Sequence, residues 1–268
     1  MKSYAPFFGF EKEPFPNELA LKDIFETDGL TGVKERFEYV LRVGGIALVT
    51  GEFGSGKSTA LRYAAGALHP AQYTVYYITA TSGSIMELYR QISDVMKIDG
   101  NKTSKAMMVA RIKHEIREKV LGQKKRPLLI IDEAFLLRLD VFSELHTLCQ
   151  FDPDSLNCLP MILAGRSSVI DRLQYYQSAS LASRVIARAH LTGLDLDATL
   201  RYLTHHLRLA GVDLDLFDAS AVTAIHQASS GVLRKINQLC RGALIAAARS
   251  QERVVTPDHV RRAASELI

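Results

Sequence analysis

The stretch "GEFGSGKS", residues 51–58, constrains the fold of this 268-residue chain more than any other. It matches the pattern G-x-x-x-x-G-K-[ST] and lies between a short apolar run, "GIALVT", and a run of helix-forming residues, "KSTALRYAAGAL". A strand, a glycine-rich turn and a helix in this order form the context in which such a loop binds phosphate. Loop N–H groups point at the phosphate, and the helix N-terminus adds partial positive charge. The sequence therefore predicts a nucleotide-binding α/β fold.

Several residues of this segment, hereafter the phosphate loop, have an expected role in binding ATP. Gly51, Gly54 and Gly56 let the backbone wrap the β-phosphate of ATP. Lys57 is expected to reach the β- and γ-phosphate oxygens, and the Ser58 hydroxyl to ligate Mg²⁺. The ATP contacts predicted in this loop and at the residue after it are Gly51, Glu52, Phe53, Gly54, Ser55, Gly56, Lys57, Ser58 and Thr59.

A second motif, "LLIIDEAF" at residues 128–135, supplies carboxylates. Asp132 and Glu133 directly follow an apolar run, which places them at the carboxyl edge of a sheet, where ligands bind in open α/β folds. Asp132 is predicted to hold Mg²⁺ through water, and Glu133 to polarise a water for attack on the γ-phosphate. A kinase has no need of the second carboxylate, whereas a hydrolase does. Together the two motifs predict Mg²⁺-dependent ATP hydrolysis.

Strand and helix patterns alternate up to residue 193 and are purely helical after it. "TVYYITA", "PLLIID" and "LPMILAG" are predicted strands, and "AHL" at 189–191 a short fifth, in a parallel sheet flanked by helices. Asp195, Asp218 and Thr256 are predicted N-caps of the later helices. We expect a Phe- and Pro-rich lead-in packed on the ATPase core over 1–28, a P-loop ATPase domain over 29–193, and a small all-helical lid domain over 194–268.

Composition and charge exclude several other classes of protein. No apolar run approaches the roughly 18 residues that a membrane-spanning helix needs, and the N-terminus lacks the apolar core of a signal peptide. The cysteines form no CxxC pair, so neither a disulfide framework nor a zinc site is indicated. A cytoplasmic location fits these features. The net charge of +4 permits an anionic partner without requiring one.

Two arginines narrow the class of ATPase. The N/T-K-x-D motif of GTPases and the LSGGQ motif of ABC transporter motors do not occur, whereas Arg184 precedes "VIARAHL" and Arg234 lies in "GVLRKINQLC". This arrangement resembles the AAA+ ATPases, in which a sheet domain is followed by a helical lid. The resemblance implies that Arg184 reaches the γ-phosphate of a neighbouring subunit, with Arg188 as the alternative. It also implies that Arg234 contacts the phosphates of its own subunit, and that the chain forms a homo-oligomeric ring or filament.

The resemblance is closest to the ExeA-type ATPases. It rests on the opening "FFGF…PF", on "TGEFGSGKST", on "IIDEA" and on "GVLRKINQLCRGALIAA", and it covers nearly the whole chain. Relatives by architecture include transposition helpers of the IstB, TnsC and MuB kind. One departure is Arg166, in "ILAGRSS", where many AAA+ proteins carry Asn, Thr or Ser and this family often has Gln. Either hydrolysis is slow, or Arg166 contacts phosphate or a neighbouring subunit.

Three functions are consistent with this resemblance. Secretion ATPases of the family continue past the lid into a membrane span, whereas this chain ends at "RRAASELI". We therefore expect a free-standing ATPase that acts on duplex DNA and helps a transposase or recombinase. The predicted DNA contacts are Lys102 and Lys105, in a region that lines the pore of similar DNA-wrapping proteins. The alternatives are an ATPase partner of a secretion or envelope-assembly system and a regulatory ATPase that remodels proteins.

Overall fold

The computed structural model describes residues 4–98, 104–151, 158–213 and 215–266. The chain divides into two compact units, which are described separately. The sheet unit comprises Thr27–Phe53 and Lys57–Leu191. The helical unit comprises Met1–Glu26, Gly54–Gly56 and Thr192–Ile268.

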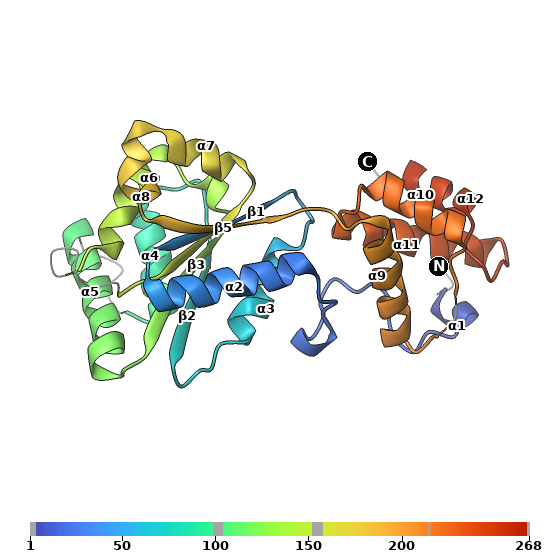
Figure 1. Cartoon of the computed structure of the whole chain (residues 1–268), viewed down its shortest axis with the longest axis horizontal. Coiled ribbons are helices and arrows are strands. Elements are labelled where there is room, and N and C mark those ends of the chain that lie inside the picture. Colours follow the sequence, from blue (N-terminus) through green and yellow to red (C-terminus); the bar gives the residue numbers. More distant parts are fainter. Residues whose placement is uncertain (1–3, 99–103, 152–157, 214, 267–268) are drawn as a thin grey trace. The chain divides into compact units, whose positions relative to one another are not determined.

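The sheet unit is built on a five-stranded sheet in the order β2-β3-β4-β1-β5, with every pair of neighbours parallel (Figure 1). The central strands are continuous apolar runs because both of their faces are covered. The predicted fifth strand, 189–191, is too short, since β5 begins at Val185 and alternates between half-buried and exposed residues. The strands are β1 (Ile46–Gly51), β2 (Tyr73–Thr79), β3 (Arg126–Asp132), β4 (Met161–Gly165) and β5 (Val185–Leu191).

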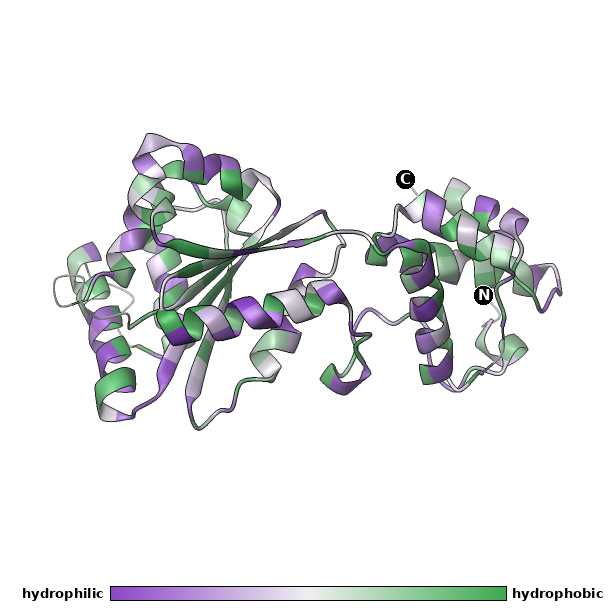
Figure 2. Ribbon diagram, viewed as in Figure 1, coloured by the Kyte–Doolittle hydropathy of each residue, from purple (hydrophilic) through white to green (hydrophobic). Residues whose placement is uncertain are grey.

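Helices cover both faces of this sheet. Figure 1 shows α2 and α3 on one side and α6, α7 and α8 on the other. Figure 2 shows the strands as mostly hydrophobic and the helices as mixed, so the helices bury one face each. Ile92, Ile112 and Phe142 are fully buried in the largest core cluster. The helices are α2 (Asp28–Val43), α3 (Lys57–Gly66), α4 (Ile85–Met96), α5 (Lys105–Arg117), α6 (Leu139–Leu145), α7 (Ser168–Gln174) and α8 (Ala179–Ala182).

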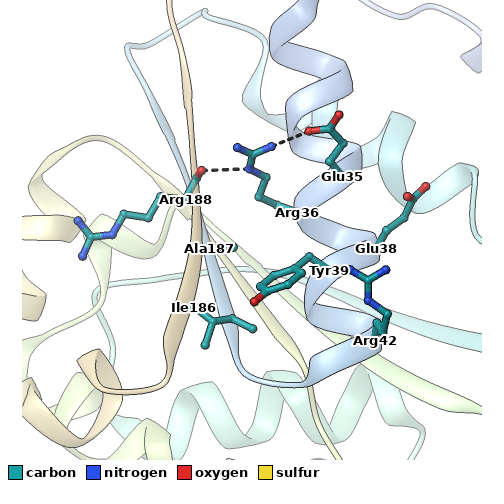
Figure 3. A pocket seen from close by; sticks show the side chains of 8 residues that line it. All are labelled: Glu35, Arg36, Glu38, Tyr39, Arg42, Ile186, Ala187 and Arg188. Carbon is teal, nitrogen blue, oxygen red and sulfur yellow. Dashed lines mark hydrogen bonds and ion pairs between the residues drawn. The ribbon is translucent and has the colours of Figure 1, made fainter.

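The outer edge of β5 is partly covered by α2 (Figure 3). Edge strands leave backbone groups unpaired and open to other chains. Here the Nε of Arg36 donates a hydrogen bond to the carbonyl oxygen of Arg188 at 3.2 Å, and its Nη1 pairs with Glu35 at 2.7 Å. A groove of about 580 Å³ lies beside this contact. Figure 3 shows the side chain of Arg188 directed away from Arg36.

The helical unit contains the helices predicted after residue 193, and their caps are as expected. Asp195 and Asp218 accept hydrogen bonds from the backbone N–H groups of Ala198 and Ala221. Thr256 forms a capping box with His259. The helices are α1 (Ala5–Phe8), α9 (Leu196–Leu209), α10 (Ala219–Ser229), α11 (Leu233–Arg249) and α12 (Pro257–Ser265).

The lead-in packs against a different part of the chain from the one predicted. Phe8, Phe10 and Phe15 lie in the core of the helical unit with residues of α9, α10 and α11. The lead-in likewise belongs to the helical unit rather than to the ATPase core. The sequence shows that aromatic side chains here need cover, but it does not show which apolar surface supplies it.

His206 of α9 fixes part of this lead-in. Its ring is fully buried and stacks on Phe15 with a centroid distance of 5.3 Å. Its Nδ1 lies 2.8 Å from the carbonyl oxygen of Pro14, to which it donates a hydrogen bond as a neutral imidazole. Burial lowers the pKa of His206 to about 4 and outweighs the Pro14 carbonyl, which raises it.

We predict that acid weakens the helical unit through His206. The unfolded histidine takes up a proton near pH 6.5, whereas the folded one resists protonation down to about pH 4, so the free energy of unfolding falls as pH falls through this window. The loss between pH 7 and pH 5 should be about 2 kcal/mol. Urea denaturation followed by circular dichroism measures it. His206→Gln keeps an N–H donor for Pro14 but cannot titrate, and should flatten the dependence, whereas His69→Gln on the surface should not. An unchanged slope in His206→Gln would refute the assignment.

Candidate nucleotide-binding site

The phosphate loop runs from the end of β1 to the start of α3. Gly54 and Gly56 have φ values of 81° and 92°, in the left-handed region that side chains disfavour. Glycine at these positions is therefore required by the backbone path. The loop ends where α3 begins, so the N–H groups of the first helical turn lie next to it.

The ammonium group of Lys57 is held inside this loop. Its side chain is only 6% exposed, and Nζ donates hydrogen bonds to the carbonyl oxygens of Gly51 at 3.0 Å and Glu52 at 2.9 Å. A buried cation is costly unless it is paired. A triphosphate is a stronger partner than two carbonyl oxygens. The ammonium therefore lies inside the phosphate loop, and its contact with phosphate remains a prediction.

Ser58 and Asp132 meet as the two motifs require. The Oγ of Ser58, at the start of α3, donates a hydrogen bond to Oδ2 of Asp132, at the end of β3, at 2.8 Å. Both are hard oxygen ligands of the kind Mg²⁺ prefers. Within the described parts of the chain, no cluster of three or more His, Cys, Asp or Glu residues could hold a metal ion.

Tyr77 of β2 is a member of this site that sequence reasoning missed. Its hydroxyl donates to the same Oδ2 of Asp132 at 2.6 Å, while the backbone N–H of Glu133 donates to Oδ1 at 2.8 Å. Burial raises the pKa of Tyr77, and its hydrogen bond to Asp132 raises it further. The hydroxyl therefore stays protonated and orients the carboxylate. The sequence alone does not indicate this role, because Tyr77 comes close to Asp132 only through the pairing of β2 with β3.

Glu133 lies immediately outside β3 and has a backbone φ of 55°. A left-handed non-glycine residue is strained by roughly 1–3 kcal/mol and is common at active sites. The turn ends the strand at Asp132, so the half-buried side chain of Glu133 no longer follows the alternation of β3. Asp132 is thus the last residue of β3 and Glu133 the first residue after it, and the task of each carboxylate remains a prediction.

Arg166 follows the end of β4 and lies beside the phosphate loop. Its guanidinium carbon is 4.8 Å from the centroid of the Phe53 ring. Nζ of Lys57 is 6.0 Å from the same ring, and Phe135 meets it edge-on with a centroid distance of 5.8 Å. Arg166, the unusual residue after the end of the fourth strand, is therefore next to the candidate phosphate site.

The other predicted arginines lie on separate elements. Arg184 immediately precedes β5, and its carbonyl oxygen accepts a hydrogen bond from the N–H of Ile46 at 2.9 Å. Arg188 lies within β5 and is exposed. Arg234 is the second residue of α11, in the helical unit. Their roles toward nucleotide remain predictions.

The predicted DNA contacts are only partly described. Lys102 lies outside the residues that the structure describes. Lys105 is exposed at the start of α5, and its ammonium pairs with the carboxylate of Glu144 at 2.6 Å. A phosphate contact by Lys105 would therefore compete with an existing ion pair.

Comparison with known proteins identifies the fold. Residues 41–173 match the family described as AAA domain. The chain is 30% identical over 260 residues to General secretion pathway protein A of Aeromonas hydrophila, an alignment that covers 95% of this chain and 47% of that protein. The chain thus spans about half the length of this curated relative.

Solved structures of replication and recombination proteins share the architecture. Cdc6p of Pyrobaculum aerophilum has a TM-score of 0.71 at 16% identity, covering 98% of this chain and 71% of that one. The ORC1 protein of Aeropyrum pernix in complex with DNA has a TM-score of 0.68 at 18% identity, covering 96% and 70%. The RuvB Holliday junction branch migration motor of Thermotoga maritima has a TM-score of 0.58 at 15% identity, covering 96% and 74%. At these identities the likeness shows the fold alone.

These comparisons confirm the predicted fold class, an AAA+ P-loop fold with a parallel sheet flanked by helices and a helical C-terminal region. ATP hydrolysis by a chain with this fold remains a proposal. The likeness to ExeA-type ATPases is supported, whereas the predicted relationship to transposition helpers is not. Among the helices of the described residues, none combines the length and the apolar character needed to cross a bilayer.

We predict that Tyr77→Phe raises the Mg²⁺ requirement of nucleotide binding. Groups that hydrogen-bond to a metal ligand commonly change metal affinity by roughly 10-fold or more when removed. Binding of a fluorescent ATP analogue, titrated with Mg²⁺, measures the half-saturating concentration. Tyr76→Phe is the matched control, because that neighbouring ring lies in the hydrophobic core. Equal Mg²⁺ requirements in Tyr77→Phe and the wild type would exclude this role.

Proposed function

We propose that this chain is a Mg²⁺-dependent ATPase of the General secretion pathway protein A kind, which works on a protein partner in secretion or envelope assembly. The observation that carries the proposal is the 30% identity that extends over 95% of this chain. The structural neighbours that include a DNA complex share less than 20% identity. They support the fold without supporting a DNA substrate. We place the activity in the cytoplasm, where ATP is supplied.

The phosphate loop and Lys57 bind the triphosphate in this proposal. The loop supplies N–H donors, and the ammonium of Lys57 moves from the carbonyl oxygens of Gly51 and Glu52 to the β- and γ-phosphate oxygens. Ser58 and Asp132 hold Mg²⁺, which when bound neutralises charge on the phosphates. The hydrogen bond of 2.8 Å between the Ser58 hydroxyl and the Asp132 carboxylate supports a shared ligand site.

Glu133 positions and activates the attacking water. It follows Asp132 directly, so a water near its carboxylate is also near the γ-phosphate bound at the sheet edge. Arg166 lies beside the phosphate loop, where its guanidinium contributes positive charge. Because charge increases on the γ-phosphate oxygens in the transition state, such cations accelerate the reaction.

Two more arginines complete the proposed site, one acting across a subunit interface and the other within its own subunit. We assign Arg184 to the neighbouring subunit's γ-phosphate, because it lies at the N-terminal end of β5, outside both motifs. Arg234 serves its own subunit's phosphates from the start of α11. Both assignments follow the resemblance to AAA+ ATPases and require the chain to assemble with copies of itself.

We predict that mixed mutants reveal a shared active site. Arg184→Ala alone should lose turnover by roughly 10³- to 10⁵-fold, and Glu133→Gln alone should bind ATP but stall. In a mixture, some interfaces combine an intact Glu133 from one subunit with an intact Arg184 from the other, so ATPase activity should recover in part. Arg188→Ala is the control for the alternative arginine. If co-assembled mixtures stay inactive and Arg188→Ala is equally impaired, the contact is made by Arg188.

We predict that the ATP-locked variant Glu133→Gln, co-expressed with the wild type, blocks protein export across the envelope, since it occupies assemblies without turning over. Export is measured in the organism that encodes the chain, with Lys57→Ala as a variant that loses nucleotide binding. In parallel, duplex DNA binding is titrated against salt with ADP and with a non-hydrolysable ATP analogue. ATP-dependent DNA binding that falls steeply with salt and weakens in Lys102→Ala with Lys105→Ala, together with normal export, would contradict the secretion proposal and favour the DNA one.

A further inference from the structure

Phe53 has an exposed aromatic ring inside the phosphate loop. The residue is 52% exposed, so its ring is not part of the hydrophobic core of the sheet unit. Two cations lie near the ring, the guanidinium of Arg166 at 4.8 Å and the ammonium of Lys57 at 6.0 Å. The edge-on contact with Phe135, at an interplanar angle of 77°, holds the ring in place. The exposed ring of Phe53 is thus in contact with Phe135 and lies close to the guanidinium of Arg166.

The backbone around Gly165 brings Arg166 to this ring. A Cβ at Gly165 would lie 3.2 Å from the backbone N of Phe135 and 3.0 Å from Cγ2 of Val169. Cβ atoms rarely come this close to other atoms. The lack of a Cβ at Gly165 therefore allows the end of β4 to approach the segment after Glu133. Arg166 is the next residue. The close approach brings the residue before Arg166 next to Phe135, and the guanidinium of Arg166 lies 4.8 Å from the centroid of the Phe53 ring.

The chemistry of the contact makes it exchangeable. A guanidinium over the face of an exposed aromatic ring is attracted weakly. The same group binds phosphate oxygens by charge-assisted, often bidentate hydrogen bonds, which are much stronger. A γ-phosphate at the loop would therefore attract the guanidinium away from the ring. ADP leaves nothing at that position to compete with the ring.

We infer that Phe53 is a positioning residue that holds Arg166 beside the phosphate loop and releases it to the γ-phosphate when ATP binds. The inference rests on the nucleotide site of the proposed function and adds the group that distinguishes ATP from ADP. Without the ring, Arg166 is free to extend into solvent, and ordering it at the γ-phosphate costs conformational entropy. With the ring, the guanidinium is already ordered next to the phosphate loop, 4.8 Å from the centroid of the Phe53 ring.

A single tryptophan tests the exchange directly, because the chain contains none. Phe53→Trp keeps the aromatic face, which attracts cations more strongly in Trp than in Phe. Binding of a non-hydrolysable ATP analogue should raise acrylamide quenching of this tryptophan roughly twofold relative to ADP, because the guanidinium uncovers one of the ring's two faces. Arg166→Gln in the same background should abolish the difference. Phe135→Trp, which reports on the neighbouring ring, should show little difference between the nucleotides.

Steady-state kinetics test whether Phe53 acts through Arg166. Phe53→Leu should lower kcat by roughly two- to fivefold, because Arg166 must then lose more conformational entropy on the way to the transition state, with KM for ATP nearly unchanged. Phe53→Tyr should restore it. In the Arg166→Gln background, Phe53→Leu should have no further effect. A further loss there, or an ATP–ADP quenching difference that survives Arg166→Gln, would overturn the inference.

The two proposals fail in different ways. If both nucleotides bind and quench the Phe53→Trp variant identically, only the exchange of Arg166 is wrong. If a fluorescent nucleotide does not bind at all, the site on which both proposals rest is wrong. Normal protein export in cells that express Glu133→Gln contradicts the proposed partner and leaves the exchange of Arg166 standing on its own measurements.

Discussion

The hydrogen bond between Ser58 and Asp132 is the contact on which the rest of the site depends. It joins the start of α3 to the end of β3 across 74 positions of sequence, at 2.8 Å. A parallel sheet makes this possible, because the carboxyl ends of its strands lie at one edge. The glycines of the phosphate loop make it accurate, since only a left-handed path at Gly54 and Gly56 returns the chain to α3 at this point. Without this contact, the phosphate-binding and carboxylate groups would belong to separate surfaces.

Around this contact, four adjacent strands contribute side chains with different tasks. Tyr77 on β2 orients Asp132 at the end of β3, while Arg166 after β4 faces Phe53 in the loop after β1. The order β2-β3-β4-β1 makes these residues neighbours, although their order along the chain differs. The groups proposed for metal ligation, for phosphate binding and for the response to the γ-phosphate therefore lie at one edge of one sheet. Tyr77, Phe53 and Arg166 give this edge features that the two motifs alone do not specify.

The features that could be predicted from the sequence are those set by local chemistry or by burial. The phosphate loop, the acidic motif and the caps Asp195, Asp218 and Thr256 each depend on a few consecutive residues. The central strands are apolar throughout because both faces are buried. Features that depend on strand order or on distant packing were missed, namely the hydroxyl of Tyr77, the full length of the edge strand β5 and the burial of Phe15 in the helical unit. The roles of Arg184 and Arg234 come from family resemblance and remain proposals.

The binding of Mn²⁺ in place of Mg²⁺ tests most directly whether this sheet edge forms one metal–nucleotide site. Mn²⁺ also prefers hard oxygen ligands, and electron paramagnetic resonance distinguishes its bound from its free form. With a non-hydrolysable ATP analogue bound and free nucleotide removed, we expect a single tightly held Mn²⁺ per chain. Asp132→Asn and Ser58→Ala should each weaken its binding by roughly 10-fold or more while the nucleotide remains bound. Mn²⁺ binding of wild-type strength in both variants would contradict the account.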